Sequence, residues 1–228
     1  MGFASLLLLR SSPGSVVLCP EYRLCSLQGG RFPAALQDAV TTYAYLVNEL
    51  QIPASDIVLS GDSAGGHLAL GLLRYLNAHQ DTLPEPAAML LWSPWPDMIT
   101  TVEVASKRPA IKVDHVALEL IAWAYRKFLP RKETKIDRSD SYLSPNTAVI
   151  PTRIPIWVQW GSAEPLREDI EKFVQLQRST SEEGCLGTYK IPHAPHDIFA
   201  LAPLLGWKSE ISKAVEEAIR FLDNGGSL

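Results

Sequence analysis

The sequence Gly-Asp-Ser-Ala-Gly at residues 61–65 constrains the fold more than any other stretch of this chain. Residues 56–60 before it form a short apolar run that predicts a buried strand. Residues 66–76 after it contain few helix breakers and predict a helix. A Gly-x-Ser-x-Gly turn between a strand and a helix predicts a nucleophile elbow, in which Ser63 has a strained backbone and an exposed hydroxyl. The alternative interpretation is a glycine-rich strand-to-helix turn with an incidental serine.

The same turn places special demands on its glycines and on the start of the helix. We expect Gly61 and Gly65 to leave room where a Cβ atom would collide across the turn. Because the predicted helix begins at Ser63, its free N–H groups and its positive dipole end would face any oxyanion formed there.

Composition limits the class of protein to which the chain can belong. The 228 residues are 46% hydrophobic with a formal net charge of −4, which fits one α/β domain and gives no electrostatic case for a nucleic-acid partner. Cys19, Cys25 and Cys185 have no metal-ligand spacing and suggest no disulfide framework, so we expect a reducing compartment, the cytoplasm. The apolar residues 1–9 lack the marks of a signal peptide and are too short to span a bilayer, so we expect no transmembrane segment.

Segments that predict strands alternate along the chain with segments that predict helices. The predicted strands are residues 15–19, 56–60, 87–92, 155–160 and 187–191, and the predicted helices are residues 32–50, 66–76, 113–129, a stretch ending near 179, and 207–222. This alternation predicts an α/β fold with a mainly parallel sheet and helices on both faces. We expect a single domain over residues 1–228, with a helical, cap-like excursion at about 98–141.

Three candidate site residues follow the ends of predicted strands, where the sites of parallel sheets gather. Ser63 would be the nucleophile, His196 the base that takes its proton, and Glu164 the acid that orients the histidine. The order Ser…Asp/Glu…His along the chain is the one expected for a nucleophile elbow on an α/β sheet. Each residue also has a simpler interpretation, such as a surface glutamate near a helix start or a hydrogen-bonded loop histidine.

Other residues compete for these roles. Glu168 and Asp169 are rivals of Glu164 for the acid, and His193, in the same loop as His196, is a rival for the base. We interpret His67 and His79, on or near the elbow helix, as structural or exposed.

These segments resemble the hormone-sensitive-lipase-like branch of the α/β-hydrolases, which are serine esterases. The motifs that carry the resemblance are Glu21-Tyr22-Arg23-Leu24, the run from Phe32 to Ala39, the run from Gly61 to Ala69, Leu91-Trp92-Ser93-Pro94-Trp95, Tyr142-Leu143-Ser144-Pro145, Glu164-Pro165-Leu166-Arg167 and His196-Asp197-Ile198-Phe199. The resemblance implies hydrolysis of small or medium carboxylic esters through an acyl-serine, with no cofactor. It also implies an alternative, a ligand-binding relative without activity, because the plant gibberellin receptors are similar to the same family.

The chain departs from the family pattern in three places. Glu164 stands where the family usually has aspartate, and Cys25-Ser26 stands where Ala-Pro is usual. The His-Gly-Gly-Gly oxyanion loop and the strands before it have no counterpart, so we interpret the chain as a catalytic half without its N-terminal part. The backbone N–H of Ala64 is then the remaining candidate oxyanion donor. We expect the strand at residues 15–19 either to pair directly with the elbow strand or to leave both edges open.

Overall fold

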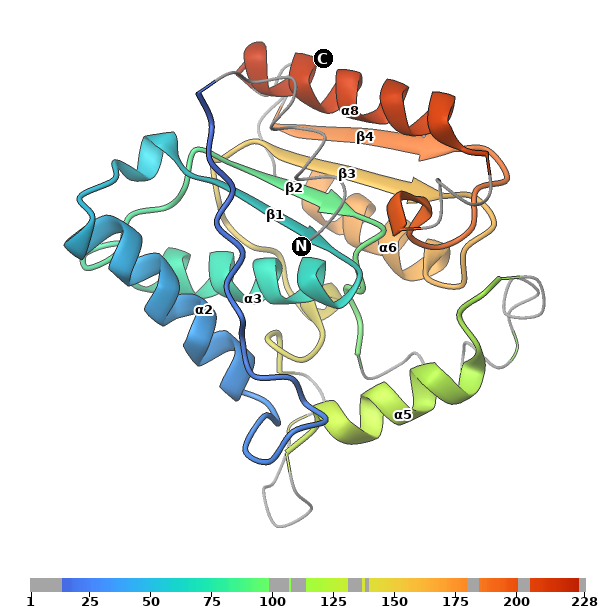
Figure 1. Ribbon diagram of the computed structural model, residues 1–228, viewed down its shortest axis with the longest axis horizontal. Helices are drawn as coiled ribbons and strands as arrows, with labels where there is room; N and C mark the ends of the chain where they lie inside the picture. Colours follow the sequence, from blue (N-terminus) through green and yellow to red (C-terminus); the bar gives the residue numbers. More distant parts are fainter. Residues whose placement is uncertain are drawn as a thin grey trace.

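The computed structural model describes residues 14–98, 107, 114–130, 137, 140–179, 185–200 and 206–225. Four parallel strands form one sheet in the order β1-β2-β3-β4, which is also their order along the chain (Figure 1). The strands are β1 (Val58–Asp62), β2 (Ala88–Trp92), β3 (Ile156–Gly161) and β4 (Leu186–Ile191). Each of the four agrees to within two residues with a strand predicted from the sequence.

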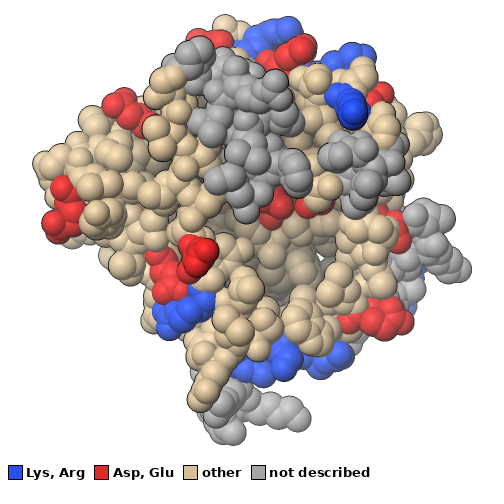
Figure 2. All heavy atoms as spheres, in the orientation of Figure 1, with Lys and Arg blue, Asp and Glu red and all other residues tan. Residues whose placement is uncertain are grey.

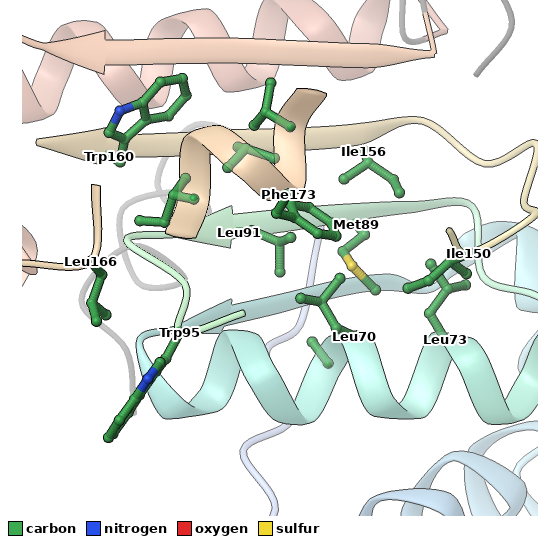
Figure 3. Packing of buried hydrophobic residues seen from close by; sticks show 14 of the residues in the cluster. Leu70, Leu73, Met89, Leu91, Trp95, Ile150, Ile156, Trp160, Leu166 and Phe173 are labelled. Carbon is green, nitrogen blue, oxygen red and sulfur yellow. The ribbon is translucent and has the colours of Figure 1, made fainter. Parts of the chain in front are cut away.

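The two central strands are buried on both faces, which explains their uninterrupted apolar sequences. On one face, Met89, Leu91 and Val158 pack against α3 (Ala64–Ala78) and α6 (Arg167–Arg178) (Figure 3). The opposite face is covered by α8 (Lys208–Asp223), whose Ala214, Ala218 and Phe221 lie in a cluster with Leu90, Trp92 and Trp157. The predicted arrangement, a parallel sheet with helices on both faces, is therefore confirmed.

The remaining described helices lie around this sandwich. They are α2 (Ala34–Ala44), the π-turn Tyr45–Glu49, α5 (Leu118–Phe128) and the short 3₁₀ turns Ala54–Asp56 and Pro145–Thr147. Tyr43 of α2 packs against Leu72 and Leu76 of α3 in a third apolar cluster. Within the described residues, no helix is both long enough and apolar enough to cross a bilayer.

The predicted excursion between β2 and β3 is described only in part. Its helix α5 lies at the foot of the view in Figure 1, and its buried Ile121 belongs to the same apolar cluster as α3 and α6. The backbone N–H of Phe32 donates to the carbonyl of Phe128 at 2.8 Å, so the end of α5 is joined to the start of the α2 segment. The other residues of the excursion, and the apolar run at residues 1–9, lie mostly outside the described residues.

The prediction of a buried strand at residues 15–19 is wrong. The segment forms no strand, Val16 is 90% exposed, and in Figure 1 the segment runs across the direction of the strands. Among the described strands β1 pairs with β2 alone, and its Val58 is 42% exposed. Of the two outcomes expected for this region, the structure has the open edge, because an apolar run can be buried as a strand only when a neighbour pairs with it and another layer covers it.

Candidate active site

Ser63 occupies a sharp turn between the end of β1 and the start of α3. Its backbone has φ 50° and ψ −116°, a region that non-glycine residues rarely adopt. Three hydrogen bonds hold this conformation: the Ser63 N–H donates to the carbonyl of Trp92 at 3.0 Å, and the Ser63 carbonyl accepts from the N–H groups of Trp95 at 3.0 Å and His67 at 3.2 Å. The surrounding backbone thus maintains the strain expected of a nucleophile elbow.

The close approach at this turn depends on Gly61 and Gly66. A Cβ atom on Gly61 would lie 2.4 Å from the carbonyl oxygen of Gly65, and one on Gly66 would lie 2.8 Å from Cβ of Pro94. A Cβ on Gly65, in contrast, would meet nothing closer than an Asp62 carboxylate oxygen at 3.9 Å. The expectation that Gly65 avoids a collision is therefore wrong, because a Cβ atom there would make only an ordinary van der Waals contact.

His196 reaches Ser63 from the loop after β4. Its Nε2 lies 2.9 Å from Oγ of Ser63, and its side chain is 6% exposed. The distance is within hydrogen-bonding range, so a neutral His196 can accept the Ser63 proton at Nε2. His193, in the same loop, is exposed and its backbone N–H donates to Oγ of Ser162 at 2.7 Å.

Glu164 lies behind the histidine with a fully buried side chain. Its Oε2 accepts hydrogen bonds from Oγ of Ser93 at 2.7 Å and from the backbone N–H of Gly161 at 3.1 Å. The same oxygen lies 3.8 Å from Nδ1 of His196, which makes the two groups an ion pair when the histidine is protonated but not a hydrogen bond. Such contacts are often long in the absence of a substrate and shorten as charge develops on the imidazole.

Sequence reasoning missed Ser93, which links Glu164 to the loop that contains His196. It follows β2, and its hydroxyl oxygen also accepts a hydrogen bond from the backbone N–H of Asp197 at 3.3 Å. The residue is 1% exposed and has φ 41°. The available signal was its place directly after a predicted strand. Residues in such positions gather at one edge of a parallel sheet.

The charges around His196 favour its protonated form. Burial alone would lower the pKa of His196, but the carboxylates of Glu164, Asp197 and Asp114 outweigh burial and raise the pKa above its ordinary value. The carboxyl of Asp197 is itself perturbed, because burial and the neighbouring carboxyl of Asp62 raise its pKa to about 6. These surroundings stabilise the imidazolium that proton transfer from Ser63 would create.

The rivals for these roles lie elsewhere. Glu168 is half exposed beside Arg167, at an N–O distance of 3.9 Å. Asp169 is buried on α6, and its backbone carbonyl accepts a hydrogen bond from Asn146 at 3.0 Å. His67 is buried with Nδ1 3.1 Å from the Trp95 carbonyl, and burial lowers its pKa to about 4, so it is neutral at working pH.

Ala64 is the first residue of α3 and is exposed beside Ser63. The first N–H groups of a helix have no intrahelical partner, and they carry the positive end of the helix dipole. The position therefore suits an N–H donor to an oxyanion formed on the Ser63 side.

The face shown in Figure 2 carries charges of both signs and is hollowed near its centre. The hollow lies between the parts of the view in which Figure 1 draws the start of α3 and the helix α5. A second cavity of about 450 Å³ is lined by residues of β3, β4 and α6, including Trp160, Glu171 and Arg178, and by none of the candidate site residues.

Comparison with known proteins places the chain in a family. Residues 6–199 match the family described as alpha/beta hydrolase fold, and the chain belongs to that family. An acetyl-hydrolase of Streptomyces hygroscopicus is 30% identical over 167 residues, which are 73% of this chain and 52% of that protein. The chain thus spans about half the length of the curated relatives that it matches.

Solved structures agree with this placement. An esterase from the bacterial hormone-sensitive lipase family matches with a TM-score of 0.69 and 26% identity, over 86% of this chain and 61% of that one. The esterase EstE5, in a crystal soaked with ethyl alcohol, matches with a TM-score of 0.70 and 26% identity, over 85% of this chain and 62% of that one. The resemblance to hormone-sensitive-lipase-like esterases that the motifs predict is confirmed.

Proposed function

We propose that this site hydrolyses carboxylic esters through an acyl-serine intermediate. The observation that carries the proposal is the 2.9 Å contact between Oγ of Ser63 and Nε2 of His196, made at a strained strand-to-helix turn. Glu164, 3.8 Å from the other imidazole nitrogen, completes a nucleophile–base–acid set in the order typical of the fold.

In the proposed acylation step, Oγ of Ser63 attacks the ester carbonyl while Nε2 of His196 takes its proton. The negative charge that develops on the carbonyl oxygen is stabilised by the N–H of Ala64 at the start of α3. The imidazolium then gives its proton to the departing alcohol, which leaves an acyl group on Ser63. In deacylation, His196 activates a water molecule that attacks the acyl-serine, and Ser63 leaves with the returned proton.

The acid has an orienting role in this proposal. Ser93 and Gly161 both donate hydrogen bonds to Oε2 of Glu164. These bonds hold that oxygen on the Nδ1 side of the imidazole. A carboxylate there fixes the tautomer with the proton on Nδ1 and leaves Nε2 free to accept from Ser63. The scheme needs no metal or organic cofactor.

The substrate class we propose is an uncharged ester of a small or medium acyl group. The support is twofold: carboxyl groups surround the histidine, which disfavours anionic substrates, and the Streptomyces hygroscopicus relative is named an acetyl-hydrolase. We further propose that residues 1–228 form one domain in which the excursion at about 98–141 is a cap over the site. His115, just before α5, supports this assignment, because its ring centre lies 6.2 Å from that of His196.

The proposal is tested by covalent labelling with a fluorophosphonate probe followed by peptide mass spectrometry. We expect the phosphonate on the peptide that contains Ser63, and no labelling of the Ser63→Ala variant. Ser60→Ala is a matched control, because it removes a hydroxyl from β1, the strand that leads into the turn at Ser63. That hydroxyl accepts a hydrogen bond from Nε1 of Trp92 at 3.1 Å. Labelling that persists in Ser63→Ala would refute the assignment, and binding of an ester analogue without labelling would favour the ligand-binding alternative.

A further inference from the structure

Asp114 connects the segment before α5 to the histidine loop, across 82 residues of sequence. One of its carboxylate oxygens, Oδ2, accepts a hydrogen bond from the backbone N–H of His196 at 2.7 Å. The other, Oδ1, accepts from the backbone N–H of Val116 at 2.8 Å and lies 3.2 Å from Nδ1 of His115. The side chain is fully buried, so the carboxylate has exchanged its hydration for these contacts.

The position of this carboxylate matters for the base because the peptide N–H that it binds belongs to His196 itself. A hydrogen bond from an amide to a carboxylate is stronger than one between neutral groups. It fixes the backbone from which the imidazole extends, and the imidazole must stay within about 3 Å of Ser63 to act as a base.

Asp114 also adds charge beside the imidazole. The groups that face His196 are Glu164 from the loop after β3, Asp197 on its own loop, Asp114 and His115 from the segment before α5, and, through Asp197, Asp62 at the end of β1. Of these, Asp114 is the one that also binds the histidine backbone directly.

We propose that Asp114 is a positioning residue for the catalytic base, holding the His196 backbone from the segment before α5 by a buried carboxylate–amide hydrogen bond. The inference rests on the proposed function, because it assigns a role relative to the base of that reaction. In this proposal, the excursion between β2 and β3 holds the backbone of His196 in place, in addition to lying beside the site.

The test measures the pKa of the His196 imidazole by NMR of histidine-labelled protein, with the signal assigned from His196→Gln. Asp114→Asn keeps the shape and one acceptor oxygen but removes the charge, so the pKa of His196 should fall by about one unit. Glu119→Gln is a matched control, since it removes an exposed carboxylate from the first turn of α5 and should leave that pKa unchanged. An unchanged pKa in Asp114→Asn would overturn the proposal.

A second measurement needs no variant and no activity. The backbone N–H of His196 in the unaltered protein should be strongly protected from hydrogen exchange, because it donates to a buried acceptor. Exchange at the rate of an exposed loop amide would contradict the inference even if Asp114→Asn failed to fold. Neither measurement requires Ser63 to react, so a failure of fluorophosphonate labelling would refute the proposed function without deciding the role of Asp114.

Where labelling does occur, its pH dependence gives an independent result. The midpoint of the rise in labelling rate with pH should move to lower pH in Asp114→Asn, in step with the imidazole pKa. A variant that lowers the rate at every pH and leaves the midpoint unmoved would indicate a merely structural contact.

Discussion

Two histidines lie three positions apart in one loop, and the structure gives them different surroundings. His196 is buried against Ser63, whereas His193 is exposed and binds Ser162 only through its backbone N–H. Since a base must reach the proton that it removes, this difference in reach leads to a direct prediction.

His196→Ala should lower the rate of Ser63 acylation by about 10⁴-fold or more, because loss of one triad member is nearly as damaging as loss of all. Glu164→Gln should lower it less, since the acid orients the imidazole and transfers no proton. Fluorophosphonate labelling rates give the comparison, with His193→Ala as the matched control that should remain close to the unaltered protein. An inactive His193→Ala beside an active His196→Ala would reverse the assignment.

Asp197 predicts a pH-dependent stability. Burial and the carboxyl of Asp62 raise its pKa in the folded protein to about 6, from 3.8. The folded state therefore favours the neutral carboxyl, so this contribution to stability is complete below pH 3.8 and is lost as the pH rises through about 6. Asp197→Asn is neutral at every pH, and asparagine tolerates the left-handed backbone at φ 47°.

The measurement for Asp197→Asn is the melting temperature relative to the unaltered protein at pH 4 and pH 8. Relative to the unaltered protein, the variant should have a higher melting temperature at pH 8 than it has at pH 4. The exposed Asp81→Asn provides the control, with a difference that does not depend on pH. An Asp197→Asn variant whose melting temperature changes equally at both pH values would show that folding does not raise the pKa of the Asp197 carboxyl.

The sequence could predict some of these residues because each has a local signal. Ser63 lies in a five-residue pattern, and Glu164 and His196 lie just after strands and in the expected order. Asp114 has no such signal, because its role arises from a contact with a residue 82 positions away. Ser93 has the signal of following a strand, but that signal does not predict its contact with Glu164, 71 positions away. Such contacts depend on how loops fold over the sheet edge, which apolar periodicity does not encode.

At the scale of elements, the close approach of α3 to the loop after β2 limits which residues can stand in the first turn of the helix. A methyl group on Gly66 would lie 2.8 Å from Cβ of Pro94 and 3.0 Å from its Cα, too close for an unstrained contact. The same change at Gly65 would meet nothing closer than a carboxylate oxygen of Asp62 at 3.9 Å, an ordinary contact distance. Two adjacent glycines of one helix turn therefore have opposite expected responses to the same substitution.

Gly66→Ala should lower the free energy of unfolding by about 1–3 kcal/mol, the usual cost of overpacking. Gly65→Ala should raise it by up to about 1 kcal/mol, because alanine is the better helix former. Urea unfolding of both variants provides the measurement, and the pair serves as its own control. Equal effects would mean that α3 can move away from Pro94 at little cost.

The positions of all four described strands were predicted correctly, but their burial was not predicted equally well. β1, which the sequence analysis expects to be buried, has a buried residue only at Gly61. Residues 88–92 and 156–161 are buried throughout, as their continuous apolar sequences predict. Residues 15–19 have a similar composition, but in the structure they are mostly exposed and form no strand. An apolar run indicates only that a segment could be buried, because burial also requires a partner strand and a covering layer.

At the scale of the whole molecule, β1 has a free side among the described strands. Unpaired strand edges with apolar side chains promote association with other chains. Val58, on β1, and Val16, in the extended segment nearest the described N-terminal end, are among the exposed large apolar residues. We therefore predict that protein made as residues 1–228 self-associates.

Val58→Lys should shift the protein toward the monomer, because a lysine on an edge strand opposes pairing with a second chain. Light scattering during size-exclusion chromatography measures the shift. Leu120→Lys is the control, since it removes an apolar side chain of similar exposure, 53%, from α5 rather than from the edge. Equal gains in monomer from both variants would indicate general surface hydrophobicity instead of edge pairing.

The strand order β1-β2-β3-β4 equals the chain order, so each strand can join the sheet beside the one that precedes it in the sequence. Among the four described strands, the sheet can grow in one direction while the chain leaves the ribosome, because each strand pairs with the one that precedes it. Ser63 follows β1 and His196 follows β4, the first and the last of the described strands. Ser63 therefore lacks its contact with His196 until β4 is in place. Under the proposed mechanism, a partly synthesised chain presents a serine that is not yet reactive.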